Sequence, residues 1–172
     1  MKWMIASDVH GSAYYCRQML EAFEREQADR LILLGDLLYH GPRNDLPREY
    51  APKEVILMLN AHKREILCVR GNCDTEVDQM VLEFPILADY AVLPVGKRLM
   101  YLTHGHRFYM DALPPMQDGD ILLHGHTHVP AGTAMQFVRM GYYISDSKDA
   151  ENGARRFNRI VSLKDSFKPD AK

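Results

Sequence analysis

Short apolar runs alternate with amphipathic stretches through the first half of the chain. Three uninterrupted apolar runs are typical of strands buried on both faces: residues 3–6, 31–34 and 66–69. Helical spacing of apolar residues predicts helices at 13–26, 52–62 and, more briefly, 76–82. Ser12 can cap the first helix, and Pro52 suits the first turn of the second. This strand–helix alternation predicts a parallel sheet.

The second half of the chain has a different pattern. Residues 90–94 and 98–102 flank a turn at 95–97 and are expected to form a hairpin, and 121–123 is a short buried strand. Further on, the pattern predicts a second hairpin, a last strand and a frayed polar tail: 134–138 with 141–144, 157–163 and 164–172. We therefore expect one α/β domain over residues 1–172, with a mixed sheet or two sheets.

Composition narrows the class of protein. The 172 residues are 47% hydrophobic, and 21 basic against 23 acidic residues give a formal net charge of -2. This balance argues against a dedicated nucleic-acid surface or a membrane surface. No apolar run approaches the roughly 20 residues that span a bilayer, and no signal peptide is predicted. The 3 cysteines form no paired framework, so we expect a reducing, cytoplasmic location.

A histidine-rich stretch follows the predicted strand at 121–123. His124, His126 and His128 occupy alternate positions, and side chains two apart on an extended chain point to the same side. His126 and His128 can therefore converge, roughly 7 Å apart along the backbone. Neutral imidazole is the commonest metal ligand, which favours a metal site. The alternative is a strand end with satisfied polar residues.

Polar residues with oxygen or nitrogen donors follow each of the other predicted strands. Ligand sites of α/β sheets gather at the carboxyl ends of parallel strands, so these side chains are expected to meet. Together they suit two divalent cations bridged by a carboxylate, an arrangement that serves phosphoester hydrolysis. Each piece alone could be an ordinary turn or polar loop. The donors in chain order are Asp8, His10, Asp36, Asn72, His104, His126 and His128.

The ordered motifs D-x-H, G-D, G-N-C-D, T-H-G-H and G-H-T-H resemble the calcineurin-like metallophosphoesterase superfamily. The segments at 40–44, 70–74 and 76–80 are similar to its YfcE-like bacterial phosphodiesterase branch, and the resemblance covers about residues 1–130. It implies a two-sheet mixed β-sandwich flanked by helices. It also implies that Asp36 bridges two metal ions. Mn²⁺ is the favoured ion, with Fe, Zn and Mg as the other candidates. By this resemblance, one ion is held by Asp8, His10, Asp36 and His128, and the other by Asn72, His104 and His126.

Two departures from the family pattern bear on chemistry and folding. Many phosphatases of the superfamily carry histidine just after the metal-binding asparagine, whereas Cys73 stands here, followed by Asp74. Next to two cations the pKa of Cys73 is expected to fall. From Tyr143 onward the chain does not match the family's closing strands, so we expect residues 143–172 to be divergent or frayed and the closure of the second sheet to be atypical.

The predicted function is hydrolysis of small phosphodiesters by metal-activated hydroxide. Asp36, His10, Cys73 and Asp74 are the candidate catalytic residues. The loop after Asp36 supplies the candidate substrate contacts His40, Arg43 and Asn44. Alternatives are a phosphomonoesterase or protein phosphatase, and a protein-interaction scaffold on the same fold. The predicted partner is a small phosphodiester, and homo-oligomerisation stays open.

Overall fold

The computed structural model describes residues 2–109, 112–127 and 142–143. Several predictions lie outside these residues. They concern His128, the strands at 134–138 and 157–163, and the tail at 164–172. Of the predicted hairpin arm at 141–144, the structure describes only the strand Tyr142–Tyr143.

The first sheet is parallel and four-stranded. It contains β1 (Trp3–Ser7), β2 (Arg30–Leu33), β3 (Ile66–Cys68) and β7 (Tyr142–Tyr143), in the order β3-β2-β1-β7. Every pairing in it is parallel. The three predicted apolar runs are therefore confirmed as neighbouring strands, and their carboxyl ends meet at one edge.

The three predicted helices are present. Helix α1 (Ala13–Arg25) begins where Ser12 Oγ accepts a hydrogen bond from the backbone N–H of Tyr15, and α2 (Pro52–Ala61) begins at its proline. Helix α3 (Glu76–Gln79) ends earlier than its apolar pattern predicts.

Beyond the end of α3, side chains form hydrogen bonds with the backbone N–H and carbonyl groups. Asn60 Nδ2 donates to the carbonyl of Val81 at 2.9 Å, and its Oδ1 accepts from the N–H of Glu83 at 2.9 Å. Gln79 Nε2 donates to the carbonyls of Leu82 and Phe84, each at 3.0 Å. Together with the bond from the N–H of Leu82 to the carbonyl of Asp78 at 3.0 Å, these contacts satisfy the backbone groups of the turn that follows the helix.

The second sheet contains β4 (Tyr90–Val95), β5 (Arg98–Thr103) and β6 (Ile121–His124), in the order β4-β5-β6. Strands β4 and β5 pair antiparallel, as the predicted hairpin requires, and β5 pairs parallel with β6. The carboxyl ends of β5 and β6 therefore point the same way and deliver His104 and His126 to one place.

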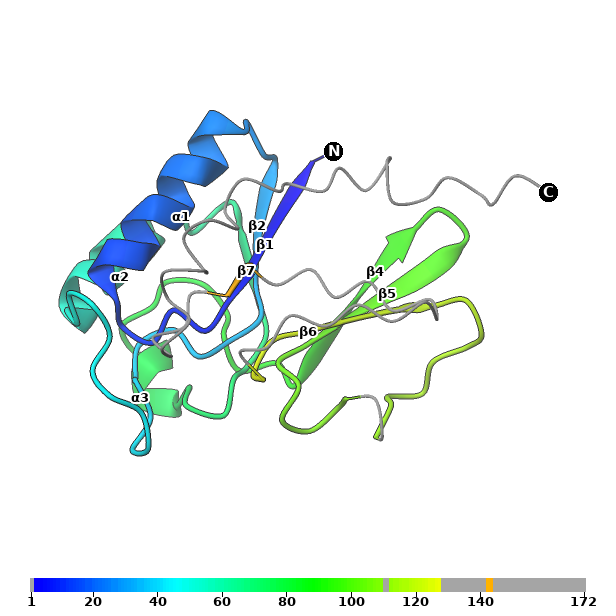
Figure 1. Cartoon of the computed structure of the whole chain (residues 1–172). Helices are drawn as coiled ribbons and strands as arrows, with labels where there is room; N and C mark the ends of the chain where they lie inside the picture. Colours follow the sequence, from blue (N-terminus) through cyan, green and yellow to red (C-terminus); the bar gives the residue numbers. More distant parts are fainter. Residues whose placement is uncertain (1, 110–111, 128–141, 144–172) are drawn as a thin grey trace.

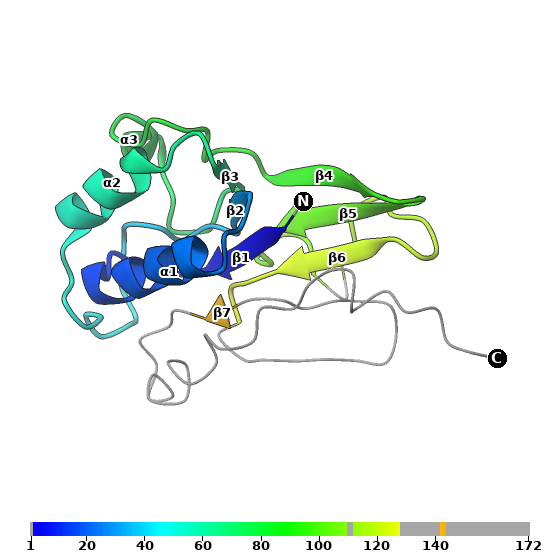
Figure 2. The same ribbon diagram turned by 90° about the horizontal axis from the view of Figure 1, so that it is seen from above.

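Alternate residues of the first sheet face two different cores. Met4 and Ala6 of β1 pack in the cluster that includes the buried faces of α1 and α2, whereas Ile5 packs in a second cluster with Leu102 and Ile121 of the other sheet. Figures 1 and 2 show the same layers, with the helices on one side of the first sheet and β4–β6 on the other. The predicted fold of two sheets flanked by helices is confirmed. None of the helices among the described residues is long and apolar enough to cross a membrane.

The core between the sheets predicts that two leucines of β5 contribute very differently to the free energy of unfolding. Leu102 is fully buried, whereas Leu99 is 40% exposed. Leu102→Ala should lower the free energy of unfolding by about 2–5 kcal/mol, because it leaves a cavity between the sheets. Leu99→Ala should change it by less than about 1 kcal/mol. Urea denaturation of both variants measures the difference, and equal losses would contradict the assignment of this core.

Candidate metal centre

The site is built from residues that follow the strands and have unusual backbone geometry. Asp8, His10, Asp36 and His126 are not glycines, yet their φ angles are +61°, +49°, +57° and +70°. Residues other than glycine rarely adopt this left-handed backbone conformation, and those that do are often found at functional sites. The loops are tied to each other, since the N–H of Asp8 donates to the carbonyl of Gly35 at 3.0 Å and that of His10 to the carbonyl of Asp36 at 2.9 Å.

Two glycines let these loops approach closely. A Cβ at position 71 would lie 2.0 Å from Asp36 Oδ1, and one at position 125 would lie 2.0 Å from Ser7 Oγ and 2.7 Å from Asp8 Oδ2. No other residue fits at either place without displacing a carboxylate or its neighbour. Gly71 and Gly125 therefore allow Asp36 and Asp8 to occupy the centre.

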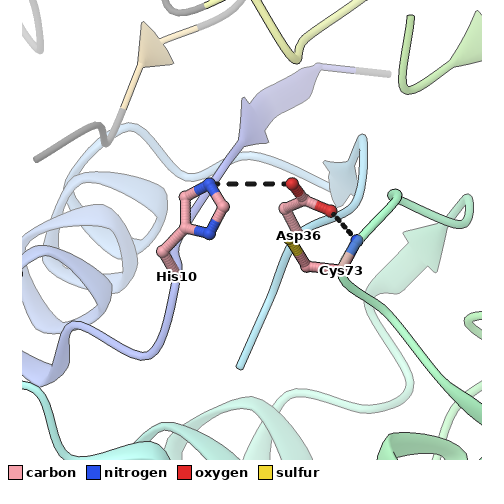
Figure 3. Close-up of side chains that lie close together, drawn as sticks. All are labelled: His10, Asp36 and Cys73. Atoms are coloured by element: carbon pink, nitrogen blue, oxygen red, sulfur yellow. Dashed lines mark hydrogen bonds and ion pairs between the residues drawn. The ribbon is translucent and has the colours of Figure 1, made fainter. Parts of the chain in front are cut away.

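The carboxylate of Asp36 is shared by two clusters of donor atoms. One contains His10, Asp36 and Cys73, and the other contains Asp36, His104 and His126, with the donor atoms of each cluster within 4.8 Å of one another. Figure 3 shows the first cluster, in which the N–H of Cys73 donates to Asp36 Oδ1 at 2.8 Å. Asp36 Oδ2 lies 3.6 Å from His10 Nε2 and 3.3 Å from His104 Nε2.

The remaining predicted donors meet at the same place. His104 Nε2 lies 3.0 Å from Asn72 Oδ1 and 3.2 Å from His126 Nδ1. Asp8 Oδ1 lies 3.6 Å from His10 Nε2 and 4.0 Å from His104 Nε2, and Asp8 Oδ2 accepts from the N–H of His126 at 3.1 Å. The structure thus brings together every predicted ligand that lies within its described residues.

Backbone carbonyls orient two of the imidazoles. Nδ1 of His104 lies 2.7 Å from the carbonyl of Leu34, and Nδ1 of His10 lies 2.7 Å from the carbonyl of Tyr39. A carbonyl only accepts, so Nδ1 carries the proton and the lone pair of a neutral ring is on Nε2, which faces Asp36. Lone pairs that converge from imidazole, amide and carboxylate suit a divalent cation. Sequence analysis missed these two carbonyls, because a backbone group leaves no signature in side-chain patterns.

The electrostatics of the cluster also favour a cation. Burial lowers the pKa of His104, but hydrogen bonding to Asp36 and the charges of Asp8 and Asp36 outweigh it and raise that pKa to about 9. The pKa of His10 is also raised, because the contacts with Asp8, Tyr39 and Asp36 exceed the effect of burial. Without a metal ion, His104 and His10 therefore keep protons that balance the negative charge of Asp8 and Asp36.

The thiol of Cys73 lies beside this centre. Asn72 Nδ2 donates to its Sγ at 3.3 Å. Burial and the charge of Asp36 raise the pKa of Cys73 to about 12 in the protein without metal. The direction is opposite to the fall expected beside two bound cations, because carboxylates are the charges that surround the thiol here.

Asp74 acts on the backbone of the site. Its carboxylate accepts from the N–H groups of Asp36 at 2.8 Å, Leu37 at 2.9 Å and Gly71 at 2.7 Å. It is 2% exposed, so these bonds are shielded from water. Its observed contacts hold the loop that carries Asp36, rather than reaching the pocket.

A pocket of about 350 Å³ opens onto the donor cluster. Arg43 and Asn44 line it, and their contact with a substrate stays a prediction. His40 is not among the described residues of its lining; its ring packs between Tyr39 and Tyr50, and its carbonyl accepts from Asn44 Nδ2 at 2.8 Å. A substrate contact from His40 stays a prediction. The lining consists of His10, Asp36, Gly41, Pro42, Arg43, Asn44, Asn72, Cys73, His126 and Thr127.

Comparison with known proteins identifies the family. Residues 1–144 match the calcineurin-like phosphoesterase superfamily domain. Phosphodiesterase YfcE of Escherichia coli strain K12 is 48% identical over 130 residues, which cover 76% of this chain and 71% of that protein. The solved structure of YfcE, a phosphoesterase from E. coli, matches with a TM-score of 0.80 at 43% identity, covering 86% of this chain and 84% of that one.

The chain belongs to the calcineurin-like phosphoesterase superfamily, and it is a phosphoric ester hydrolase. The resemblance inferred from the motifs is confirmed. Members of this family use divalent metal ions, and the donor set around Asp36 fits such ions.

A separate similarity concerns a shorter piece of the chain. A segment of 41 residues, 24% of the chain, is 54% identical to glutamine–tRNA ligase of Clostridium kluyveri, of which it covers 7%. So small a share carries no activity of the ligase to this protein. The family match ends at residue 144, and the divergence expected for residues 143–172 stays a prediction.

The contacts of Asp74 predict a structural role that is measurable without metal. Asp74→Ala should lower the free energy of unfolding by about 2–5 kcal/mol, because it leaves buried N–H groups without an acceptor. Asp45→Ala, in the exposed part of the loop after β2, should cost less than about 0.5 kcal/mol. Denaturation in the presence of a chelator measures both, and a near-neutral Asp74→Ala would contradict this role.

Proposed function

We propose that this protein is a phosphodiesterase that uses two divalent metal ions to hydrolyse small phosphodiesters. The observation that supports it best is the position of Asp36, whose carboxylate belongs to both donor clusters. A carboxylate that bridges two ions is typical of sites for phosphoester hydrolysis. Arg43 and Asn44, which line the adjoining pocket, are the proposed substrate contacts.

In this proposal Asp36 would be shared by the two ions, and the remaining ligands would divide between them. When bound, the ions supply Lewis acidity and an activated water. Gly71, Gly125 and Asp74 keep the carboxylates in place. His128 lies outside the described residues, and its role follows from the sequence resemblance. One ion would be held by Asp8, His10, Asp36 and His128, and the other by Asn72, His104 and His126.

Cys73 favours diesters with good leaving groups over alkyl monoesters. A basic leaving alkoxide benefits from a positioned acid, which a histidine provides near neutral pH. A thiol, with an ordinary pKa of about 8.5, is a poorer proton donor than histidine, and beside two cations it would lose its proton and donate nothing. A monoesterase is therefore the less favoured alternative. A scaffold would not need the converging donors that are present here.

Mn²⁺ is the proposed ion, with Fe, Zn and Mg as alternatives, and the cytoplasm is the proposed location. Cys16, Cys68 and Cys73 are all free thiols, as expected in a reducing compartment.

The proposal is tested by stripping the protein of metal and adding back Mn²⁺, Mg²⁺, Zn²⁺ and Fe²⁺ in turn. Each form is assayed with aryl phosphodiesters and with phosphomonoesters.

The bridging role of Asp36 predicts that metal binding and diester hydrolysis are lost together. Asp36→Asn should lower bound metal and reduce diester hydrolysis at least about 100-fold, since even partners of metal ligands cost 10–100-fold. Asp118→Asn, at an exposed aspartate, should leave both unchanged. Metal analysis and kcat/KM of the purified variants measure the two effects. Two ions retained with near-normal turnover would refute the assignment of Asp36.

A further inference from the structure

The turn at residues 41–44 forms the part of the pocket that lies beside Cys73. Gly41 has a φ of +85°, and a Cβ there would lie 3.6 Å from Cys73 Sγ. Asn44 closes the turn, since its Nδ2 donates to the carbonyl of His40 at 2.8 Å and its N–H to the carbonyl of Gly41 at 3.4 Å. Arg43 is therefore carried on a hydrogen-bonded turn next to the donor cluster.

The direction of displacement determines which part of a substrate meets this turn. Hydrolysis at a two-metal site is an in-line displacement, so the nucleophile and the leaving oxygen lie on opposite sides of phosphorus. With metal ions held by the donor atoms around Asp36, the nucleophile would come from that side. The leaving group would then point into the pocket, toward lining residues that are not metal ligands.

Few of those residues can stabilise negative charge. Asn44 uses its amide N–H₂ on the carbonyl of His40, and Cys73 Sγ accepts from Asn72. Among the described residues that line the pocket, Arg43 carries the permanent positive charge. The ion pairs found among the described residues do not engage it; the nearby Arg48, in contrast, packs over the ring of Tyr14 at 3.6 Å.

We propose that Arg43 is a catalytic residue that stabilises the negative charge on the leaving oxygen. This rests on the proposed function. For an aryl diester, the oxygen of one water bonds to phosphorus. The bond to the aryl oxygen breaks, and the aryl oxide leaves with the electron pair. The two protons of the water pass to solvent. Arg43 donates hydrogen bonds to the departing oxide and keeps its own proton.

The test uses methyl aryl phosphodiesters whose phenols span a range of pKa, with the metal-loaded protein. Arg43→Met should lower kcat/KM about 10-fold for the 4-nitrophenyl ester and about 100-fold for the phenyl ester, because the more basic leaving group depends more on charge stabilisation. Arg43→Lys should recover part of the loss, because it restores the charge without the planar fork. Arg48→Met is the matched control from the same loop and should behave as the wild type.

Equilibrium binding of 4-nitrophenolate gives a readout that does not depend on turnover. Calorimetry should show weaker binding to Arg43→Met than to wild type, at equal metal content and equal Tm. An equal loss of kcat/KM across the series would overturn the inference, because Arg43 would then contact a phosphoryl oxygen. So would no loss at all. A wild type that hydrolyses no diester with any metal would instead refute the proposed function.

Discussion

The convergence of acceptor atoms around the Asp36 carboxylate is the interaction on which the rest of the site depends. Asp36 Oδ2 lies within 3.6 Å of Nε2 of both His10 and His104, while Asn72 Oδ1 approaches His104 from another strand end. Without a cation, protons on His104 and His10 balance these carboxylates, because, despite burial, hydrogen bonding and charge from Asp8 and Asp36 hold the pKa of both rings above the usual value. A divalent cation would take the place of those protons, so the geometry favours metal binding.

The surrounding fold keeps these atoms from relaxing apart. Asp74 fixes the N–H groups of Asp36, Leu37 and Gly71, and carbonyl groups fix the two imidazoles through Nδ1. Left-handed backbone at Asp8 and Asp36 adds strain that the sheets on either side must support. Stability and function are therefore in opposition here, and the layered core offsets the cost of the centre.

The strands and most of the donors could be predicted because both depend on local sequence. Apolar runs such as residues 31–34 mark buried strands, and a parallel sheet brings their carboxyl ends together, so Asp36 and Asn72 were expected to meet. The length of α3 was not predictable from periodicity, since Asn60, a residue of another helix, binds the backbone of the segment that follows it. The packing of His40 between Tyr39 and Tyr50 was not predictable either, because contacts between rings within a loop leave no periodic pattern in the sequence.

The central claim is that one carboxylate joins two metal ions. The most direct test is electron paramagnetic resonance of the protein after addition of two equivalents of Mn²⁺. Two ions bridged by Asp36 should give the spectrum of an exchange-coupled pair, and Asp36→Asn should abolish that coupling. A wild-type spectrum that contains only isolated Mn²⁺ signals, at full occupancy of two ions, would contradict the account.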